Sequence, residues 1–488
     1  MGKYTLVIDQ GGHSTRAIVF NKKGQPLAYS SEPILDALPS TTGWIEYAPE
    51  SIIQSTKTLL ERLLSQLKSK QLAKIHACSI IAQRSSIIAC NKNGSAIGPM
   101  ISWQDTRNNT WLAEQDFDIT LLQEITGLRL NAHAGASKMR WLLDHDKRIQ
   151  KHAEKKDLVF VPWGAYFLAQ LTDKEYSQKH SVVTDPILAS RTGLTEYGQL
   201  KWSEQLQTLF NIPSNTLPPI VPTTYDYGYL SLGELSIPIK LLGGDQNFIP
   251  YAYGKSAMEN AAFLNIGTGA FIQAKVTLDK AKNDPLLLTA AEIETKKKLN
   301  RIKEGTINAA ATALDWWQEQ LPRPYSFDEL NTLLKTNDIA PLFINTLAGT
   351  GSPYWLAKSP AKFIGDSQVA YTNEQKTIAI IESIIFGVVI NLGYIKKTNP
   401  QIDNIIISGG LSKIDALCQT LANLAKLSVI RYKDSEASAR GVVFYLNDID
   451  HYKPKEPPQR FTPNNEEAAI VSNRLQDYKD QMEKRLQN

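Results

Sequence analysis

The sequence predicts a mixed α/β protein built on central sheets. Apolar strand-like runs alternate with amphipathic helical patterns to about residue 240. A strand, a glycine turn and a second strand open the chain, and the same arrangement returns about 260 residues later. A length of 488 residues suggests two to four domains. We therefore expect two related α/β halves.

The first half begins with a strand meander and continues as alternating helices and strands. Residues 4–20 form two apolar runs around Gly11-Gly12, and a third extended run follows a turn at 21–24. From Pro49 to about residue 67, apolar residues recur at helical spacing and predict an amphipathic helix. A short buried strand is expected at 78–81.

A glycine turn ends the first half, and two further glycine turns and one apolar helix predict the second half. Strand 237–242 ends in Gly243-Gly244, residues 262–276 form a second hairpin, and strand 404–408 ends in Gly409-Gly410 before a helix near Asp415. The most apolar stretch, 378–390, contains two polar residues and predicts a buried helix. The charged pattern after His451 predicts a peripheral tail.

Composition excludes several classes of protein. Lys plus Arg total 53 and Asp plus Glu 49, a net charge of +4 that is spread along the chain, so no nucleic-acid partner is expected. Three distant cysteines without a CxxC pair argue against disulfides and structural zinc. The charged N-terminus and the lack of an 18-residue apolar run predict a soluble cytoplasmic protein without a membrane segment.

The glycine turns indicate nucleotide binding, because backbone N–H groups in such turns can converge on a phosphate. Taken singly, each turn is more often an ordinary tight turn. The sequence lacks GxxxxGK[ST], which disfavours a P-loop enzyme, and lacks GxGxxG followed by an acidic residue, which disfavours a dinucleotide oxidoreductase.

Five segments, in this order and spacing, resemble the FGGY family of carbohydrate kinases, with glycerol kinases the nearest by eye. They are Asp9-Gln-Gly-Gly-His-Ser-Thr-Arg16, Ile101-Ser-Trp-Gln-Asp-Thr-Arg107, Gly243-Gly-Asp-Gln246, Ile266-Gly-Thr-Gly269 and Ser408-Gly-Gly-Leu-Ser-Lys413. The resemblance extends from about residue 4 to 445. One such segment means little, but the ordered set is hard to obtain by chance.

The resemblance implies two actin-like, ribonuclease-H-like domains with ATP and sugar in the interdomain cleft. It divides the chain into residues 1–247 with the sugar site and first phosphate loop, 248–447 with the ATP site, and a tail at 448–488. ATP and Mg²⁺ are the implied cofactors and a small polyol or sugar is the implied substrate. Relatives often form dimers or tetramers, so a homo-oligomer is possible.

The resemblance also assigns the reacting groups. Asp245 matches the family's catalytic aspartate, which takes the proton of the attacking hydroxyl, and Gln246 helps hold the substrate. Asp9 matches the residue that positions Mg²⁺, with Asp245 as the second carboxylate. On pattern alone, an aspartate at a strand end or glycine turn is as readily a turn-former.

Matched positions complete the two binding sites. The expected substrate contacts are Arg84, Ser85, Trp103, His133, Asp245 and Gln246. The expected ATP contacts are Gly11, Gly12, His13, Ser14, Arg16, Gly267, Thr268, Gly269, Ala311, Gly409, Gly410 and Ile414. Trp103 on pattern alone is more often a core residue, and Asp105 and Arg107 are expected to form a structural ion pair.

Several positions depart from the glycerol kinase pattern. Gly12 and His13 stand where threonines are usual, and His13 either donates to phosphate or faces solvent. Ser85 replaces a glutamate and His133 a tyrosine, so we expect a polyol or ketose that is longer than glycerol or differently oriented. Ala311, Asp315 and Ile414 replace glycine, glutamine and asparagine near adenosine, where an isoleucine can pack on adenine but cannot hydrogen-bond it.

Three functions are weighed on these residues. The first is an ATP- and Mg²⁺-dependent kinase that phosphorylates a primary hydroxyl, which the retained Asp9 and Asp245 favour. The second is a degenerate nucleotide- or sugar-binding regulator, motivated by the departures. The third is an actin-like ATPase, which would have no need for the acceptor-side residues Arg84 and Trp103.

Overall fold

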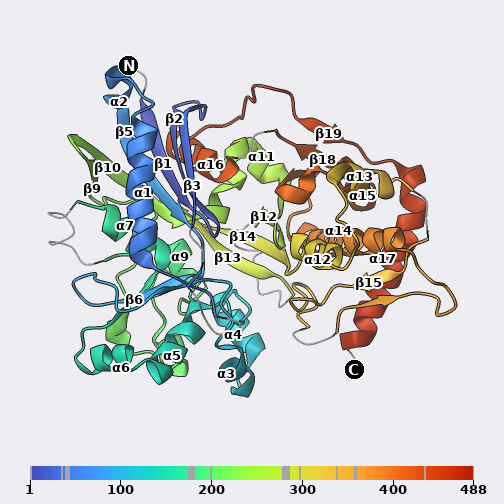
Figure 1. Cartoon of the computed structure of the whole chain (residues 1–488), viewed down its shortest axis with the longest axis horizontal. Helices are drawn as coiled ribbons and strands as arrows, with labels where there is room; N and C mark the ends of the chain where they lie inside the picture. The colour runs from blue at the N-terminus through green and yellow to red at the C-terminus, as the bar shows by residue number, and fades with distance from the viewer. Residues whose placement is uncertain are drawn as a thin grey trace. The chain divides into compact units, whose positions relative to one another are not determined.

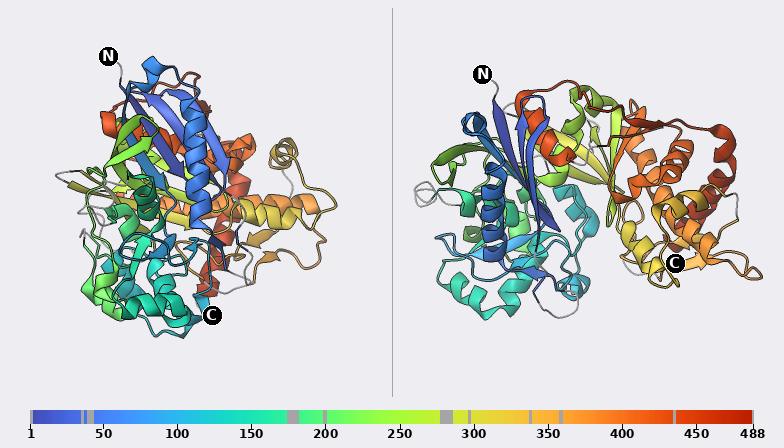
Figure 2. Two further views of the ribbon diagram at one scale, coloured as in Figure 1. Left: turned by 60° about the vertical axis from the view of Figure 1, so that its left-hand side comes forward. Right: turned by 45° about the horizontal axis from the view of Figure 1, so that its top comes forward.

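The computed structural model of the chain contains two compact units (Figures 1 and 2). It describes residues 3–34, 37–38, 44–173, 182–197, 201–276, 286–295, 298–336, 339–356, 360–433 and 436–486. The first unit consists of Met1–Lys255, Ala290–Asn300 and Glu436–Asp450, and the second of Ser256–Thr289, Arg301–Ser435 and His451–Asn488. The expected domain ranges 1–247, 248–447 and 448–488 stay a prediction. The compact units combine segments that are distant in sequence, so they do not test these ranges.

The first unit is built on a six-stranded sheet. Its order is β3 (Pro26–Pro33), β2 (Ser14–Asn21), β1 (Tyr4–Gln10), β5 (Ile75–Ala82), β10 (Leu235–Gly244) and β9 (Tyr229–Leu232). The opening meander pairs antiparallel, as expected, whereas β5 is parallel to both β1 and β10. The three parallel strands therefore end at the same edge of the sheet.

Helices cover both faces of this sheet because its strands are apolar at successive positions. Leu6 and Ile8 of β1 pack in one cluster with α1 (Pro49–Leu64) and α7 (Trp163–Leu171). Val7 points to the other face and packs with α16 (Ala437–Asn447). This alternation fixes which face of β1 each helix covers.

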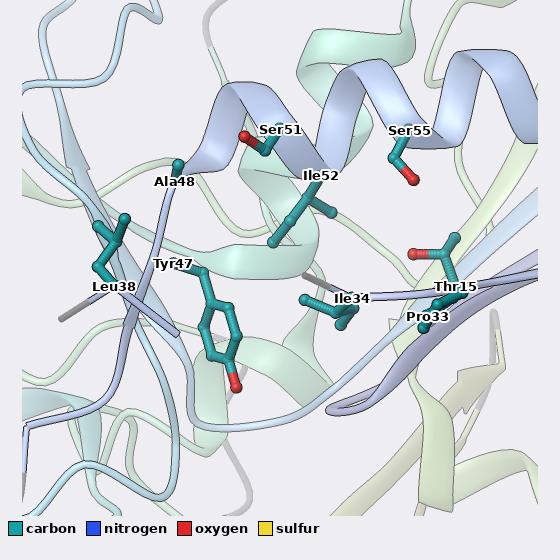
Figure 3. A pocket seen from close by; sticks show the side chains of 9 residues that line it. All are labelled: Thr15, Pro33, Ile34, Leu38, Tyr47, Ala48, Ser51, Ile52 and Ser55. Atoms are coloured by element: carbon teal, nitrogen blue, oxygen red, sulfur yellow. The ribbon is translucent and has the colours of Figure 1, made fainter. Parts of the chain in front are cut away.

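A four-stranded sheet and short helices complete the first unit around a third apolar cluster. The strands, in sheet order, are β4 (Glu46–Tyr47), β7 (Met100–Ile101), β6 (Ile87–Cys90) and β8 (Val159–Pro162). The helices are α2 (Ser69–Leu72), α3 (Asn109–Glu114), α4 (Ile119–Thr126), α5 (Gly135–His145), α6 (Lys147–Glu154), α9 (Pro186–Ser190), α10 (Glu204–Leu209), and the 3₁₀ turns η1 (Ser214–Thr216), η2 (Asp245–Phe248) and η3 (Pro250–Tyr253). A small pocket of about 150 Å³ lies beside the start of α1 (Figure 3).

The second unit repeats the strand order of the first. Its strands belong to a seven-stranded sheet with the order β13 (Leu288–Thr295), β14 (Lys298–Ile307), β12 (Ala270–Val276), β11 (Ala261–Ile266), β17 (Asn404–Ser408), β18 (Ser428–Arg431) and β19 (Gln459–Phe461), in which residues 290–300 of β13 and β14 are grouped with the first unit. The antiparallel hairpin β11–β12 corresponds to β1–β2, and the parallel strands β17 and β18 correspond to β5 and β10. The predicted pair of related α/β halves is thus confirmed.

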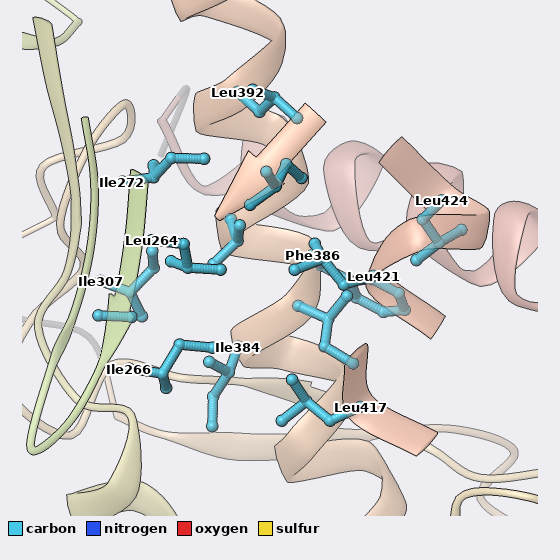
Figure 4. Packing of buried hydrophobic residues seen from close by; sticks show 14 of the residues in the cluster. Leu264, Ile266, Ile272, Ile307, Ile384, Phe386, Leu392, Leu417, Leu421 and Leu424 are labelled. Carbon is cyan, nitrogen blue, oxygen red and sulfur yellow. The ribbon is translucent and has the colours of Figure 1, made fainter. Parts of the chain in front are cut away.

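Buried apolar residues from sheet and helices meet in the core of the second unit (Figure 4). Leu264 and Ile272 of the sheet face α14 (Asn373–Thr398), and Leu417 and Leu421 of α15 (Asp415–Ala425) pack on its other side. The remaining elements are α11 (Lys255–Asn260), α12 (Ala311–Gln318), α13 (Phe327–Leu333), β15 (Leu342–Ile344), β16 (Lys362–Ile364), η5 (Gly410–Lys413) and α17 (Asn465–Leu486). The predicted helix at 378–390 is the buried middle of α14.

The apolar character of α14 corrects one sequence expectation. Contrary to the expected lack of a membrane-length apolar run, an 18-residue window of α14 reaches a mean hydropathy of 2.1 and is by length and composition long enough to cross a membrane. Of that window, 78% is buried inside the protein. Burial on this scale identifies α14 as the central helix of a packed core.

The C-terminal segment is not the expected peripheral tail. Strand β19 pairs antiparallel with β18 and extends the sheet. Three residues of α17, Leu475, Tyr478 and Met482, are buried in the core of the second unit. Arg474 of the same helix forms an ion pair with the buried Glu382 of α14. The segment is therefore an integral part of the unit.

Candidate functional site

Three chemically active side chains follow the parallel strands of the first unit. Asp9 lies near the end of β1, Arg84 follows β5 by two residues, and Asp245 comes directly after β10. The register aligns Gln10 with Ala82 and Ala82 with Gly244 across the three strands. Side chains distant in sequence thus gather at one carboxyl edge, where open α/β sheets bind their ligands.

Burial governs the ionisation of the two carboxylates. It raises the pKa of Asp9 to about 7, with Arg16 opposing the rise and the neighbouring charge of Asp245 adding to it. Burial likewise raises the pKa of Asp245, which the Arg84 guanidinium and a hydrogen bond from the Gln246 backbone N–H (2.8 Å) partly offset. Two mutually repelling carboxylates at a sheet edge form a set that is suited to a proton or a cation.

The Asp9 and Asp245 pair fits a magnesium ion in its donor chemistry. Mg²⁺ prefers oxygen ligands and is usually held by one or two carboxylates, with water and phosphate oxygens completing the shell. Within the described part of the chain, no group of three or more His, Cys, Asp or Glu side chains could hold a metal by protein ligands alone. A cation held by this pair would therefore need ligands from water or substrate.

Arg84 is held in place from two sides. Its guanidinium donates to Asn247 Oδ1 at 3.2 Å. A Cβ at Gly244 would lie 2.8 Å from Arg84 Cγ, so the glycine is needed for the arginine stem to pack there. Ser85 follows in the left-handed region with φ of 67°, an uncommon conformation for a residue with a side chain.

The first phosphate loop closes as a tight turn between β1 and β2. Gly11 N–H donates to the Ser14 carbonyl at 3.0 Å, and His13 is exposed at the tip. Arg16 lies opposite Asp9 in the β1–β2 register and pairs with Glu436 at 3.4 Å. The exposed His13 ring agrees with either expected role, as a phosphate donor or a solvent-facing residue.

Trp103 and His133 form one wall beside this loop. Their ring centroids are 5.5 Å apart, and a Cβ at Gly12 would lie 3.5 Å from Trp103 Nε1. His133 Nδ1 lies 2.7 Å from the Trp103 carbonyl, which can only accept, so Nδ1 carries the proton. Burial lowers the pKa of His133 to about 4, so Nε2 is an unprotonated acceptor near neutral pH.

A buried lysine supports this wall from behind. Lys138 is fully buried, and its Nζ donates to the carbonyls of Trp103 (3.3 Å) and His133 (3.4 Å). Burial lowers the pKa of Lys138 to about 7, although Asp105 opposes the shift. The buried amino group therefore ties the backbone of both wall residues together, while desolvation disfavours its charged form.

This lysine predicts a pH-dependent difference in stability. Between pH 7 and 10 the unfolded chain binds a proton at Lys138 that the folded chain does not, so the wild type should gain stability as pH rises. The gain is at most about 1.4 kcal/mol per pH unit. Lys138→Met should lack it, whereas exposed Lys151→Met should keep it, as urea unfolding across this pH range will measure. Parallel wild-type and Lys138→Met profiles would contradict the prediction.

A chain of buried hydrogen bonds connects the phosphate loop to the wall. Gln10 accepts from the indole of Trp163 and from Gln83 Nε2 (3.3 Å). Gln83 Oε1 accepts from the Ser86 hydroxyl (3.0 Å), which in turn accepts from the Trp103 N–H (2.9 Å). Because each of these groups is satisfied by the next, the chain fixes the spacing between loop and wall.

The second unit carries the predicted glycine turns for nucleotide. In the β11–β12 turn, the carbonyls of Gly267 and Thr268 accept from Ala311 N (3.0 Å) and Ala310 N (2.8 Å) at the start of α12. A Cβ at Gly269 would lie 2.9 Å from a backbone carbonyl oxygen, so this turn needs glycine. These hydrogen bonds hold the β11–β12 turn against the start of α12.

The third glycine turn follows β17. Gly409 has φ of 95°, and a Cβ there would lie 2.4 Å from the Ile266 carbonyl oxygen at the end of β11. Gly410 is exposed and has open space around its α-carbon. The two glycines therefore bring the β17 turn against the β11 turn, which places the predicted phosphate and adenosine glycines side by side.

Ala311, Asp315 and Ile414, which the sequence places near adenosine, differ in accessibility. Ala311 is half-buried at the start of α12, and Asp315 is exposed one turn later. Ile414 is fully buried in the apolar core of the second unit. Its side chain thus has no exposed surface to pack on adenine, in contrast to the expectation.

Asp105 and Arg107 form the structural ion pair that the sequence predicts. The Arg107 side chain donates twice to the buried Asp105 carboxylate, at 2.9 and 2.8 Å, and its guanidinium also pairs with Glu46 at 2.7 Å. The guanidinium lies over the rings of Trp44 (4.2 Å) and Trp141 (5.0 Å). Both charged groups are buried and paired with protein groups, so we assign them a structural role and not a ligand contact.

Family models match this chain over both halves. The N-terminal domain model of the FGGY family of carbohydrate kinases covers residues 4–248, and the C-terminal domain model covers 262–446. The chain belongs to the FGGY family of carbohydrate kinases. It is accordingly an ATP-dependent phosphotransferase with the actin-like fold of that family.

Individual relatives of this FGGY kinase support the same assignment. A glycerol kinase of Streptococcus uberis is 30% identical over 470 residues, covering 92% of each chain. The crystal structure of Plasmodium falciparum glycerol kinase with ADP matches with a TM-score of 0.81 at 18% identity, covering 99% of this chain and 98% of that one. The ligand-bound xylulose kinase of Lactobacillus acidophilus matches with 0.82 at 20% identity, covering 98% and 97%.

Several residues that contact the site were not predicted from the sequence. Lys138, Asn247 and Glu436 received no role, although each contacts a predicted site residue. Glu436 is about 420 positions from Arg16, so local pattern gives no hint of their pairing. Lys138 sits in a helical pattern where a lysine ordinarily faces solvent.

Proposed function

We propose that this FGGY kinase transfers the γ-phosphoryl group of ATP to a primary hydroxyl of a small polyol or ketose. The observation that carries the proposal is the gathering of Asp9, Arg84 and Asp245 at one sheet edge. Phosphoryl transfer needs positioning and charge neutralisation, together with a base for the hydroxyl proton. These residues supply both requirements.

Asp245 is proposed as the general base. Burial raises the pKa of this carboxylate and so brings it closer to the basicity of a useful proton acceptor, while the Arg84 guanidinium opposes the rise. Gln246 Nε2 lies 3.5 Å from Asp245 Oδ2 and is placed to orient the carboxylate and substrate together. Deprotonation of the acceptor hydroxyl by Asp245 would accompany its attack on phosphorus.

Mg²⁺ is proposed to bind with Asp9 and Asp245 as protein ligands. When bound with ATP, the ion would neutralise charge on the phosphate oxygens. The glycine turns of the second unit, Gly267–Gly269 and Gly409-Gly410, are proposed to hold the nucleotide through backbone N–H groups. Arg16, with the loop Gly11–Ser14, is proposed to contact the phosphates.

The acceptor is proposed to be larger than glycerol or bound in a different orientation. Ser85 is short and presents a hydroxyl where glycerol kinases carry a carboxylate. His133 offers its Nε2 as an acceptor for a substrate hydroxyl, beside the Trp103 ring as an apolar support. Relatives named as glycerol and xylulose kinases bracket this size range.

A panel of acceptors tests this proposal through ADP release with Mg²⁺-ATP. Four- and five-carbon polyols and pentuloses should give a higher kcat/KM than glycerol, because replacing a carboxylate by serine opens space and removes an acceptor. Ser85→Glu should shift the ratio toward glycerol. A kcat/KM for glycerol above that of every larger acceptor would overturn the size proposal.

The same panel separates the competing functions. Release of ADP at one rate with and without acceptors would favour the actin-like ATPase. ATP binding without any ADP release would favour the regulator, detected as ligand-induced stabilisation. A cytoplasmic location and a homo-oligomeric state stay predictions.

A further inference from the structure

A small pocket in the first unit lies outside the residues assigned to catalysis. Its volume is about 150 Å³, and it opens between the start of α1 and the strands β2 and β3 (Figure 3). Thr15 of β2 and Ser55 of α1 face each other across it (Figure 3). Ile34 and Ile52 supply hydrocarbon on its sides. The pocket is therefore amphipathic.

The hydroxyl of Thr15 lacks a partner for its hydrogen-bonding groups. Thr15 is only 3% exposed, yet its Oγ1 has no hydrogen bond to any residue that the structure describes. The Ser55 hydroxyl is likewise without one in the described ranges. Neither oxygen is among the side-chain atoms that the described structure buries without a partner, so both hydroxyls open into the pocket and can pair there with water or a ligand.

The lining also defines the chemistry of an occupant. No lining residue that the structure describes carries a charge, which disfavours ionic ligands. A cavity of about this volume holds a benzene-sized molecule, which corresponds to roughly six non-hydrogen atoms. Two facing hydroxyls suit two ligand hydroxyls, and the isoleucines suit a short alkyl chain.

We propose that this pocket binds a neutral short-chain alkanediol or closely similar small alcohol, separately from the substrate site. The ligand hydroxyls would pair with Thr15 and Ser55, and its carbons would pack on Ile34 and Ile52. Since no metal, charge or covalent step is involved, affinity is expected to be modest and driven by shape and hydrogen bonding.

A ligand in this pocket would also affect the first phosphate loop. Thr15 pairs with Gln10 in the β1–β2 register, and the Ile34 N–H donates to the His13 carbonyl at 2.9 Å. The pocket and the loop thus share two strands. Binding is expected to change the KM for ATP more than kcat, and this one readout rests on the proposed function.

Saturation-transfer NMR with 1,2-butanediol tests the site on the full-length protein. The wild type should show transfer to the diol. Ser55→Leu, which fills the pocket, should abolish it, and Thr15→Val, which keeps the shape but removes the hydroxyl, should weaken it several-fold. Thr58→Val on the exposed side of α1 should leave it unchanged.

A second comparison distinguishes this site from the substrate site. Trp103→Ala removes part of the proposed acceptor wall and should leave diol binding intact. Loss of transfer in Trp103→Ala with retention in Ser55→Leu would overturn the proposal, as would no transfer to the wild type. Thermal unfolding of each variant will show whether it is folded. Because diol binding and acceptor turnover are measured separately, the failure of one proposal does not decide the other.

Discussion

Asp245→Asn is expected to reduce turnover with the best acceptor by at least roughly 10²-fold, because a general base typically contributes that much or more. Asparagine keeps the size of the side chain and its hydrogen bond from Gln246, but it cannot take the hydroxyl proton. The KM for ATP should change less than kcat. Steady-state ADP release will measure both quantities.

The matched control for this variant is Asp226→Asn, which changes an exposed carboxylate of the same unit. It should retain wild-type turnover. Because burial raises the pKa of Asp245, neutralising it should not lower the free energy of unfolding. Near-normal turnover of a folded Asp245→Asn protein would remove Asp245 from the role of base.

Arg474→Ala is expected to lower the free energy of unfolding by about 3–5 kcal/mol, since it strands a buried carboxylate. Arg474 Nε donates to Glu382 at 3.0 Å, and its guanidinium also donates to the Pro341 carbonyl at 3.1 Å. Only 7% of the Glu382 side chain is exposed. The variant therefore loses both the charge partner and the anchor of α17.

Two comparisons identify the cause of this loss. Asn473→Ala, on the exposed side of α17, should change stability by less than about 0.5 kcal/mol. Replacing both partners, Glu382→Leu with Arg474→Met, should recover much of the loss, because no charge is then left buried. Urea unfolding measures all three, and a loss below about 1 kcal/mol for Arg474→Ala would contradict the account.

The fold was predictable where the pattern is local. The two hairpins around Gly11-Gly12 and Gly267–Gly269 combine apolar runs with turn glycines, and both form as expected. The ends of the strands then determine where Asp9 and Asp245 lie, so their position at the edge of the sheet could also be predicted. What the sequence could not provide is the partner of each strand, which is set by contacts hundreds of residues apart.

The C-terminal segment shows why the rest escaped prediction. Charged residues dominate α17, but its buried Leu475, Tyr478 and Met482 recur at spacings of three and four. That apolar stripe indicates a helix packed on a core, but the charged composition of the segment favoured the prediction of a peripheral tail. The expectation that Ile414 packs on adenine is not met for a different reason. The burial of a single side chain depends on packing that the family pattern does not record.

The destination of the γ-phosphoryl group separates a carbohydrate kinase from an ATPase most sharply. ATP labelled in its γ-phosphate would be incubated with the protein, Mg²⁺ and the best acceptor, and the label traced to a phosphate ester or to inorganic phosphate. We expect label in an ester of a primary hydroxyl, and we expect Asp245→Asn to abolish formation of this ester. Label found only in inorganic phosphate, at one rate with and without acceptor, would contradict this expectation.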